Sequence, residues 1–365
     1  MRLTNLQALR GVACLLVLVF HASEWELKRC ADVAVRVTEP FQHFGYAGVD
    51  LFFVLSGFVI TWVTFAKLGD RSQFLDFTWR RLWRILPLYW ACWVGVILAY
   101  TFILRQPFIP TARWFIGNIL ILPAQPMHLF IPQAWSLAYE LLFYGVFALL
   151  FLVPRRAALP ALAAWFVVIV ACALQGIPAP VARGPIGRCA VQLINPLVLE
   201  FLIGCAAAAL LRSDRGWRWG RWALIAGIAG FAATGAAQFA GWIDTKIDYL
   251  VRAATFGLSS GLVVFGATAS ERAFGLSSPR WLQVVGDASY SIYLVHIGVL
   301  EVVQHWWGSL PHALGLHLIY LAALIGGSLA VGFAVYFTVE RPILRVLQRR
   351  PKPDARSVPP QRRAA

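Results

Sequence analysis

Charged residues are scarce in this chain. Asp, Glu, Lys and Arg make up 13% of its 365 residues, about half of the roughly 25% that is usual in a soluble domain. Among the charged residues, the acidic ones are the fewer, with 17 Asp and Glu against 32 Lys and Arg. Hydrophobic residues make up 59%, and they gather in runs of the length, about 20 residues, that is typical of membrane-spanning helices. This composition excludes a soluble two-domain protein and predicts an all-α polytopic membrane protein.

Paired cysteine motifs, internal repeats and a second soluble domain are also missing. The cysteines show no CxxC spacing and lie mostly in apolar runs, so we interpret them as small buried hydrophobic residues. They are Cys14, Cys30, Cys92, Cys172, Cys189 and Cys205. We therefore predict no metal site and assign no disulfide. The Pro-rich, basic segment 346–365 is predicted to be a disordered cytoplasmic tail, which leaves 1–345 as one transmembrane domain.

Ten apolar runs are long enough to cross a bilayer. They cover 6–23, 47–66, 85–104, 134–153, 159–176, 191–211, 222–242, 249–268, 287–306 and 314–338. The run Trp114–Leu122 is shorter, because nine helical residues cover about 14 Å, or half of the hydrocarbon thickness. With this run not spanning and the N-terminus inside, most Lys and Arg fall on the cytoplasmic side. The positive-inside rule thus predicts ten spans, cytoplasmic N- and C-termini, and a re-entrant or interfacial element at about 112–123.

The first span carries two ionisable residues, Arg10 and His21, in "LRGVACLLVLVFHAS". An ionisable group inside a bilayer costs about 3 kcal/mol on insertion scales, so each one suggests a function. Eleven helical residues turn through about 1100°, about 20° past three full turns, so both side chains share a face about 16 Å apart. Arg10 alone is equally well explained as a snorkelling anchor, and His21 as a hydrogen-bonded helix-end histidine. Their shared face favours a function.

Two carboxylates are predicted at the depth of His21, in the outer half of the membrane. Asp50 opens the second span in "GYAGVDLFFVLSGFVI", where it can also cap the helix. Glu140 lies inside the fourth span in "QAWSLAYELLFY", where capping does not explain it, and it shares a face with Ser136 at i and i+4. A histidine with a carboxylate partner is the minimal general base. We therefore predict His21, Asp50 and Glu140 as catalytic residues.

Two further groups of residues stand out. Arg80, Arg81 and Arg84 begin the third span in "FTWRRLWRILPLYW", and they suit either topology signalling or the binding of phosphates, which match the forked guanidinium group. The ninth span, in "GDASYSIYLVHIG", places Tyr293 and His296 on one stripe. His296 is explained equally well as a core histidine bonded to a neighbour and as a substrate contact.

Taken together, these segments resemble the membrane acyltransferase-3 family, and most closely its ExoZ-like exopolysaccharide-production branch. The resemblance covers nearly the whole chain. It rests on the order and spacing of "LQALRGVACLLVLVFHA", "GVDLFFVLSGFVI", "RRLWRILPLYW", "AWSLAYELLFY", "LVLEFLIG" and "GDASYSIYLVH". Two positions depart from the family pattern. Gln7 stands where the family often has Asp, and Leu141 where it often has a second acid after Glu140.

The resemblance implies transfer of an acyl group, commonly acetyl or succinyl, from cytoplasmic acyl-CoA as co-substrate. The acceptor is then a hydroxyl of a surface polysaccharide or its lipid-linked precursor, and the location a bacterial inner membrane with its lipids. No bound cofactor and no nucleic acid are expected. His21 is the essential histidine of this pattern and Arg10 its partner. The expected donor-binding residues are Arg10, Arg80, Arg81 and Arg84. The expected substrate-binding residues are Trp135, Ser136, Tyr139, Tyr293 and His296.

Alternative mechanisms and functions stay open at this point. His21 can act as a general base or form an acyl-histidine intermediate. Ionisable residues inside the membrane also suit a transporter or flippase for glycan or lipid, although the chain shows no paired repeats with matched broken helices. A scaffold for a polysaccharide-synthesis complex is a third interpretation, in which His21 and Arg10 would be replaceable.

Overall fold

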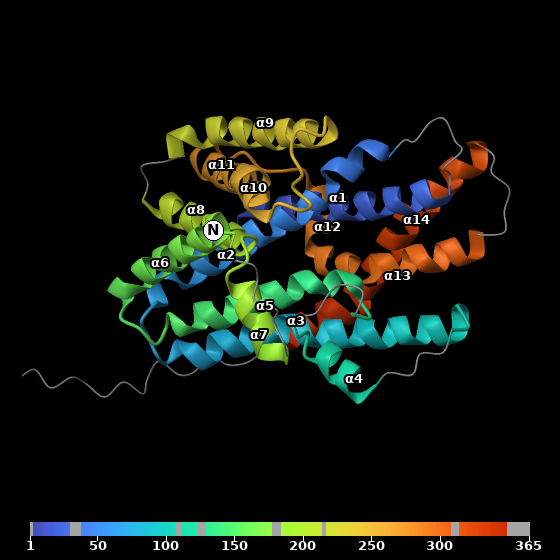
Figure 1. The fold of residues 1–365 in the computed structure, drawn as a ribbon, viewed down its shortest axis with the longest axis horizontal. Coiled ribbons are helices and arrows are strands. Elements are labelled where there is room, and N and C mark those ends of the chain that lie inside the picture. Colours follow the sequence, from blue (N-terminus) through green and yellow to red (C-terminus); the bar gives the residue numbers. More distant parts are fainter. Residues whose placement is uncertain are drawn as a thin grey trace, which may run out of the picture.

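The computed structural model describes residues 3–29, 38–106, 111–122, 129–176, 184–213, 217–307 and 314–348. Throughout these ranges the regular structure is helical, without a strand (Figure 1). The α-helices are α1 (Thr4–Arg29), α2 (Gly48–Thr64), α3 (Gln73–Leu98), α4 (Ala112–Ile119), α5 (Trp135–Leu149), α6 (Arg155–Leu174), α7 (Gly184–Leu193), α8 (Val198–Arg212), α9 (Gly220–Phe239), α10 (Tyr249–Arg252), α11 (Leu258–Phe274), α12 (Arg280–Asp287), α13 (Ser289–Trp307), α14 (Leu314–Val335) and α15 (Arg341–Gln348). Short π-helical turns extend α3 and join α10 to α11 and α14 to α15.

Seven helical segments of the described chain are long and apolar enough to cross a membrane. They are Thr4–Leu27, Gly45–Lys67, Gln73–Ile103, Arg155–Leu174, Gly220–Phe239, Tyr249–Phe274 and Leu316–Leu347. The bent pair α7–α8 brings the number to eight if it is one span. The polytopic helical class predicted from composition is therefore confirmed.

The predicted span 191–211 is wrong as a continuous helix. The chain instead forms α7 and α8, bent by 49° at a short break. Pro196 lies in this break and disfavours helical geometry for Asn195 before it. The Asn195 side chain accepts a hydrogen bond from the backbone N–H of Leu197, 2.9 Å away, so α8 starts anew after the proline.

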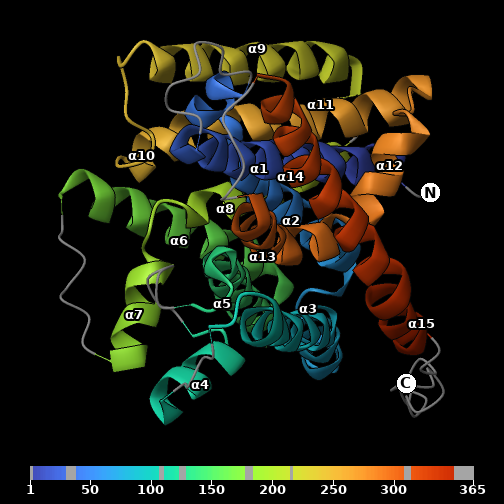
Figure 2. The ribbon, with the colours of Figure 1, turned by 90° about the vertical axis from the view of Figure 1, so that its right-hand side faces the viewer.

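Helix α1 lies in the middle of the bundle. It contacts α2, α12 and α13, whereas α9 and α4 lie at opposite sides of the molecule in both views (Figures 1 and 2). Helix α4 has 8 residues, which is about 12 Å of helix and too short to span. Its end is held to α3 because Tyr89 and Trp90 donate hydrogen bonds to the carbonyl oxygens of Asn118 and Ile119, at 2.9 and 2.8 Å. Residue 123 lies outside the described residues.

Helices α2 and α8 pack through glycine. A Cβ atom on Gly57 would lie 1.9 Å from the carbonyl oxygen of Phe201, and one on Gly204 would lie 2.0 Å from that of Val54. Backbones this close leave no room for a side chain, as in other membrane helix pairs that meet through small residues. This contact fixes α2, whose first turn carries Asp50 and whose middle lines an internal cavity.

Candidate active site

A cavity of about 260 Å³ lies between α1, α2, α3, α5 and α13. Its walls combine apolar side chains with a similar number of polar and charged ones. The polar and charged residues that line it are Gln7, Arg10, Ser56, Arg81, Arg84, Ser136, Glu140, Tyr144, Ser289, Tyr290 and Tyr293. Three arginines against one glutamate give the cavity an excess of positive charge. Such a space suits a ligand with negative charge at one end.

Arg10 points into this cavity from α1. Its Nε and one terminal nitrogen lie 3.3 and 3.2 Å from the Ser289 hydroxyl at the start of α13. Arg84, Glu340 and Glu140 are the charged groups that interact with it. Arg10 therefore has polar neighbours inside the protein, which a side chain that only snorkels to the lipid surface would lack.

Glu140 faces the same cavity from α5. The Ser56 hydroxyl donates to its Oε1 at 2.7 Å, and the Tyr144 hydroxyl donates to the same oxygen. These two bonds hold the carboxylate on the cavity wall, one turn from Ser136. Ser56 and Tyr144 were not predicted as site residues. The i, i+4 spacing of Glu140 and Tyr144 is a signal that could have indicated the second of them.

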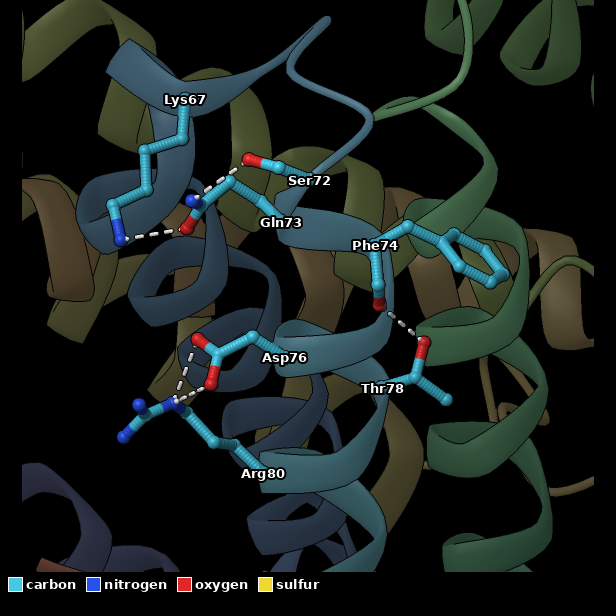
Figure 3. Close-up of polar contacts among 7 residues, drawn as sticks. All are labelled: Lys67, Ser72, Gln73, Phe74, Asp76, Thr78 and Arg80. Atoms are coloured by element: carbon cyan, nitrogen blue, oxygen red, sulfur yellow. Dashed lines mark hydrogen bonds and ion pairs between the residues drawn. The ribbon is translucent and has the colours of Figure 1, made fainter. Parts of the chain in front are cut away.

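The three arginines of α3 do not act as one group. Arg81 and Arg84 line the cavity, and the Arg81 guanidinium lies 5.6 Å from the centroid of the Tyr144 ring. Arg80 turns away and pairs with Asp76 at 2.8 Å, with 48% of its side chain exposed (Figure 3). Arg80 thus does not line the cavity, because its guanidinium group is held by Asp76 one turn earlier on α3. Its predicted role in donor binding stays a prediction, and the donor-binding set proposed below leaves it out.

The turn before α3 is polar and exposed. Gln73 accepts a hydrogen bond from Lys67 at 3.0 Å (Figure 3). The hydroxyl and backbone N–H of Ser72 both donate to Asp70, at 2.6 and 3.0 Å, and these bonds hold the pKa of the Asp70 carboxyl below its ordinary value. This polar turn contrasts with the enclosed face of α3 that carries Arg81 and Arg84.

His21 and His296 form a pair between α1 and α13. Nδ1 of His21 lies 3.2 Å from Nε2 of His296, and the ring centroids are 5.0 Å apart. Neither ring lines the cavity. Arg10 and His21 thus both contact α13, at Ser289 and His296, which confirms that they share one face of α1.

With both rings neutral, the hydrogen bonds assign their tautomers. Nδ1 of His296 lies 2.7 Å from the Tyr293 carbonyl oxygen, and Nδ1 of His21 lies 2.9 Å from that of Val17. A carbonyl oxygen only accepts, so each Nδ1 carries the hydrogen. Nε2 of His296 then accepts from His21 Nδ1–H, which it shares with Val17. The lone pair of the His21 ring is consequently on Nε2, the nitrogen that a general base would use.

Tyr293 lies between the cavity and the histidine pair. Its hydroxyl lines the cavity, 2.8 Å from Ser136 Oγ and 3.0 Å from the Gln133 carbonyl oxygen. Its own carbonyl oxygen accepts from His296. Gln133, which was not predicted, also donates to the carbonyl oxygens of Tyr293 and Leu294, at 3.1 and 2.7 Å. These bonds fasten the start of α5 to α13.

Three predicted site residues lie elsewhere. Asp50 is fully buried, and both of its oxygens accept from Arg252 at 2.8 and 2.6 Å, so it forms an ion pair with α10. Trp135 and Tyr139 pack around Phe53, with ring centroids 6.3 and 6.0 Å from it, and neither lines the cavity. The sequence contained a signal for this pairing that was missed. Arg252 lies in an apolar run, and an arginine buried there requires an acidic partner.

The described part of the chain contains no group of three His, Cys, Asp or Glu side chains arranged to hold a metal ion. Cys14, Cys92, Cys172, Cys189 and Cys205 are free thiols. Cys30 lies outside the described residues. The chemistry available at the site is therefore that of arginines, hydroxyls, one carboxylate and a histidine pair.

The fold and the site together define a helical membrane enzyme with a positively charged internal cavity and a histidine pair. A family model described as "Acyltransferase domain" matches residues 3–337, and the chain belongs to this family, acyltransferase-3. The protein is thus an enzyme that transfers acyl groups other than amino-acyl groups.

Two curated relatives match most of the chain. "Exopolysaccharide production protein ExoZ" of Rhizobium meliloti (strain 1021) is 32% identical over 313 residues, which cover 82% of this chain and 90% of the relative. "Acyltransferase MdmB" of Streptomyces mycarofaciens is 26% identical over 387 aligned residues, covering 96% of this chain and 93% of the relative. No solved structure gives a significant match.

Proposed function

We propose that this protein is an integral-membrane O-acyltransferase that moves an acetyl or succinyl group from acyl-CoA to a hydroxyl of a surface polysaccharide or its lipid-linked precursor. The observation that carries the proposal is the arrangement along α1, where Arg10 lies in the arginine-lined cavity and His21 lies in the histidine pair. The relative named for exopolysaccharide production supports a polysaccharide acceptor. The partners that this reaction needs are the acyl-CoA donor, the glycan acceptor and the lipids of the membrane.

The proposed setting is a bacterial inner membrane, with ten spans and both termini in the cytoplasm. Helices α5 and α13 and the bent pair α7–α8 complete the set of ten with the seven long apolar segments. In this orientation Arg81 and Arg84 begin the third span on the cytoplasmic side, as the positive-inside rule favours. The cavity then faces the cytoplasmic acyl-CoA pool, and His21 lies toward the outer face.

The donor binds first through its phosphates. Arg81 and Arg84 offer guanidinium forks at the cavity, which suit phosphate oxygens. Oε1 of Gln7 also belongs to this site, because Gln7 lines the cavity and this oxygen is buried without a hydrogen-bond donor among the described residues. A buried acceptor of this kind needs a partner. The amide N–H groups of the pantetheine arm supply one as the arm extends past Arg10.

Acyl transfer follows at His21. Nε2 of His21 takes the proton of the acceptor hydroxyl while the hydroxyl oxygen attacks the thioester carbonyl carbon. A C–O bond forms and the C–S bond breaks, and the leaving thiolate recovers the proton from the imidazolium ring. His296 accepts from Nδ1–H throughout and so keeps Nε2 free of hydrogen at the start. General-base help of this kind accelerates a reaction by roughly 10²–10⁴-fold.

In the proposed site, Tyr293 lies between the cavity that holds acyl-CoA and the base His21. The thioester has to pass its ring to reach His21, so the reactive state requires the hydrogen bonds of Tyr293 to Ser136 and Gln133 to open. This arrangement keeps water from the thioester until an acceptor is present. On the basis of these contacts, the proposed site keeps Ser136, Tyr293 and His296. It leaves out Trp135 and Tyr139.

The test uses the full-length enzyme in membranes with labelled acetyl-CoA or succinyl-CoA and a glycolipid acceptor fraction. Wild-type protein is expected to transfer the label to glycan, and His21→Ala to lower the rate by roughly 10²–10⁴-fold. His305→Ala, at an exposed histidine near the end of α13, is the matched control and should keep the rate. Full transfer by folded His21→Ala would refute the proposal. Movement of unlabelled glycan across the membrane without acylation would support a transporter instead.

A further inference from the structure

Three buried ionisable side chains meet away from the cavity. Asp50 comes from α2, Glu200 from α8 and Arg252 from α10, and their exposed fractions are 0%, 0% and 6%. Helices α2 and α8 pack against each other, and the π-helical turn Ala253–Gly257 that follows α10 contacts both (Figure 1). One cation and two carboxyl groups, all buried, present an imbalance of charge, because an uncompensated buried charge is very costly.

Arg252 forms its hydrogen-bonded ion pair with Asp50. Its Nε donates to one carboxylate oxygen at 2.8 Å and a terminal nitrogen to the other at 2.6 Å, which is the bidentate geometry of strong arginine–carboxylate pairs. The Tyr46 ring covers the guanidinium group at 4.9 Å. Asp50 is therefore the ionised acid of the cluster, and the charge of Arg252 is already balanced.

Glu200 has no such partner. Both of its carboxyl oxygens are buried without an N–H or O–H donor in the part of the chain that is described. The Asp50 carboxylate is the charged group that acts most strongly on it, and an anion can only accept a hydrogen bond. Two carboxyl groups can share a hydrogen bond only when one of them carries a proton. Because Asp50 accepts two charge-assisted bonds from Arg252, that proton is on Glu200.

We propose that Glu200 and Asp50 form a proton-binding site, in which neutral Glu200 donates a hydrogen bond to the Asp50 carboxylate. With the proton bound, the cluster holds one anion and one cation and is neutral. Without it, a second buried anion faces Asp50 across the interface of α2 and α8 and repels it. The proton is thus the ligand that lets the three helices close on one another.

The charged groups that act on Glu200 are Asp50 and Arg252. Nζ of Lys246 lies 5.3 Å from the centroid of the Tyr46 ring, and Lys246 is not among them. From α5, Tyr139 interacts with Glu200 as a neutral phenol, and Tyr46 faces Asp50 and Arg252. Gly257, after α10, is so close that a Cβ atom on it would lie 3.0 Å from Glu200 Cγ. The Glu200 side chain is therefore fully buried and packed closely against the backbone that follows α10.

The first test is infrared spectroscopy of the purified full-length protein at neutral pH. The spectrum of the wild type minus that of Glu200→Gln is expected to show the carbonyl band of one protonated carboxylic acid. Absence of this band would overturn the proposal. The same difference spectrum for Glu271→Gln is the matched control. Glu271 is also a buried glutamate, but it accepts three hydrogen bonds from Thr4 and Asn5, so it should give no such band.

The second test is thermal stability as a function of pH in sodium-free buffer. Raising the pH is expected to lower the melting temperature of the wild type by removing the shared proton, and to affect Glu200→Gln much less. Glu200→Gln, a neutral group of similar shape, should melt close to the wild type at neutral pH, whereas Glu271→Gln should melt lower. Equal alkaline losses in the wild type and Glu200→Gln would overturn the proposal. So would stabilisation of the wild type alone by sodium ions, which would mark a cation site.

Discussion

His21 of α1 and His296 of α13 face each other with Nδ1 and Nε2 separated by 3.2 Å. The contact joins the first helix to one that begins 268 positions after His21 in the chain. Because the Tyr293 carbonyl oxygen fixes the hydrogen of His296 on Nδ1, the contact also fixes which nitrogen of His21 carries the lone pair. The role proposed for His21 as a base depends on this orientation.

Replacing His296 tests that orientation. His296→Leu removes one of the two acceptors of His21 Nδ1–H and leaves the Val17 carbonyl oxygen. We expect up to about a tenfold loss of the acyl-transfer rate, since one hydrogen bond contributes about 0.5–1.5 kcal/mol. His296→Gln keeps an acceptor oxygen near the position of Nε2 and should retain more of the rate. The measurement is the rate constant at saturating acyl-CoA. Equal loss in both variants would point to packing as the reason.

The arginines of α3 should separate into two functional groups. Arg81→Ala and Arg84→Ala are each expected to raise the KM for acyl-CoA by tenfold or more, since hydrogen bonds to charged groups contribute about 1.5–3 kcal/mol. Arg80→Ala loses only an exposed ion pair with Asp76, a pair of a kind that contributes about 0–1 kcal/mol. Its KM should stay close to that of the wild type. A rise for Arg80→Ala as large as for the other two would contradict the division.

Gln7→Leu should weaken donor binding without weakening the fold. The substitution removes a buried oxygen that has no hydrogen-bond donor within the described chain, so the melting temperature of the free protein should stay level or rise. The lost bond to the donor should raise the KM for acyl-CoA by about fivefold, from about 1 kcal/mol. Binding and melting are measured on the same preparation. Unchanged donor binding would remove Gln7 from the proposed site.

Glycine at the contact of α2 and α8 should be irreplaceable. Gly57→Ala places a Cβ atom 1.9 Å from the Phe201 carbonyl oxygen, and such overpacking costs about 1–3 kcal/mol or more. Gly145→Ala in α5 is the matched control, since nothing lies within 4 Å of its added Cβ. It should be neutral or stabilising by up to about 1 kcal/mol. Equal melting temperatures for both variants would show that the helices can separate at no cost.

The sequence by itself determined the class of the protein and the shared face of Arg10 and His21. Both follow from local rules, because apolar runs of about 20 residues span membranes and helical geometry repeats every 3.6 residues. Helical geometry does not separate Arg80 from Arg84, since residues one turn apart share a face, so the position of Arg80 outside the cavity depends on its pairing with Asp76. The break before α8 could have been predicted, from Pro196.

Only the tertiary structure decided which polar groups meet. Asp50 and Arg252 are 202 positions apart, and His21 and His296 are 275 apart. Within one helix the sequence gives the direction of a side chain, but its partner depends on which helix packs there. Close packing of backbones through Gly57 and Gly204 brings α2 and α8 together, and this contact gives the buried acids their neighbours. Asp50, which the sequence pattern placed at the depth of His21, is therefore paired with Arg252 instead.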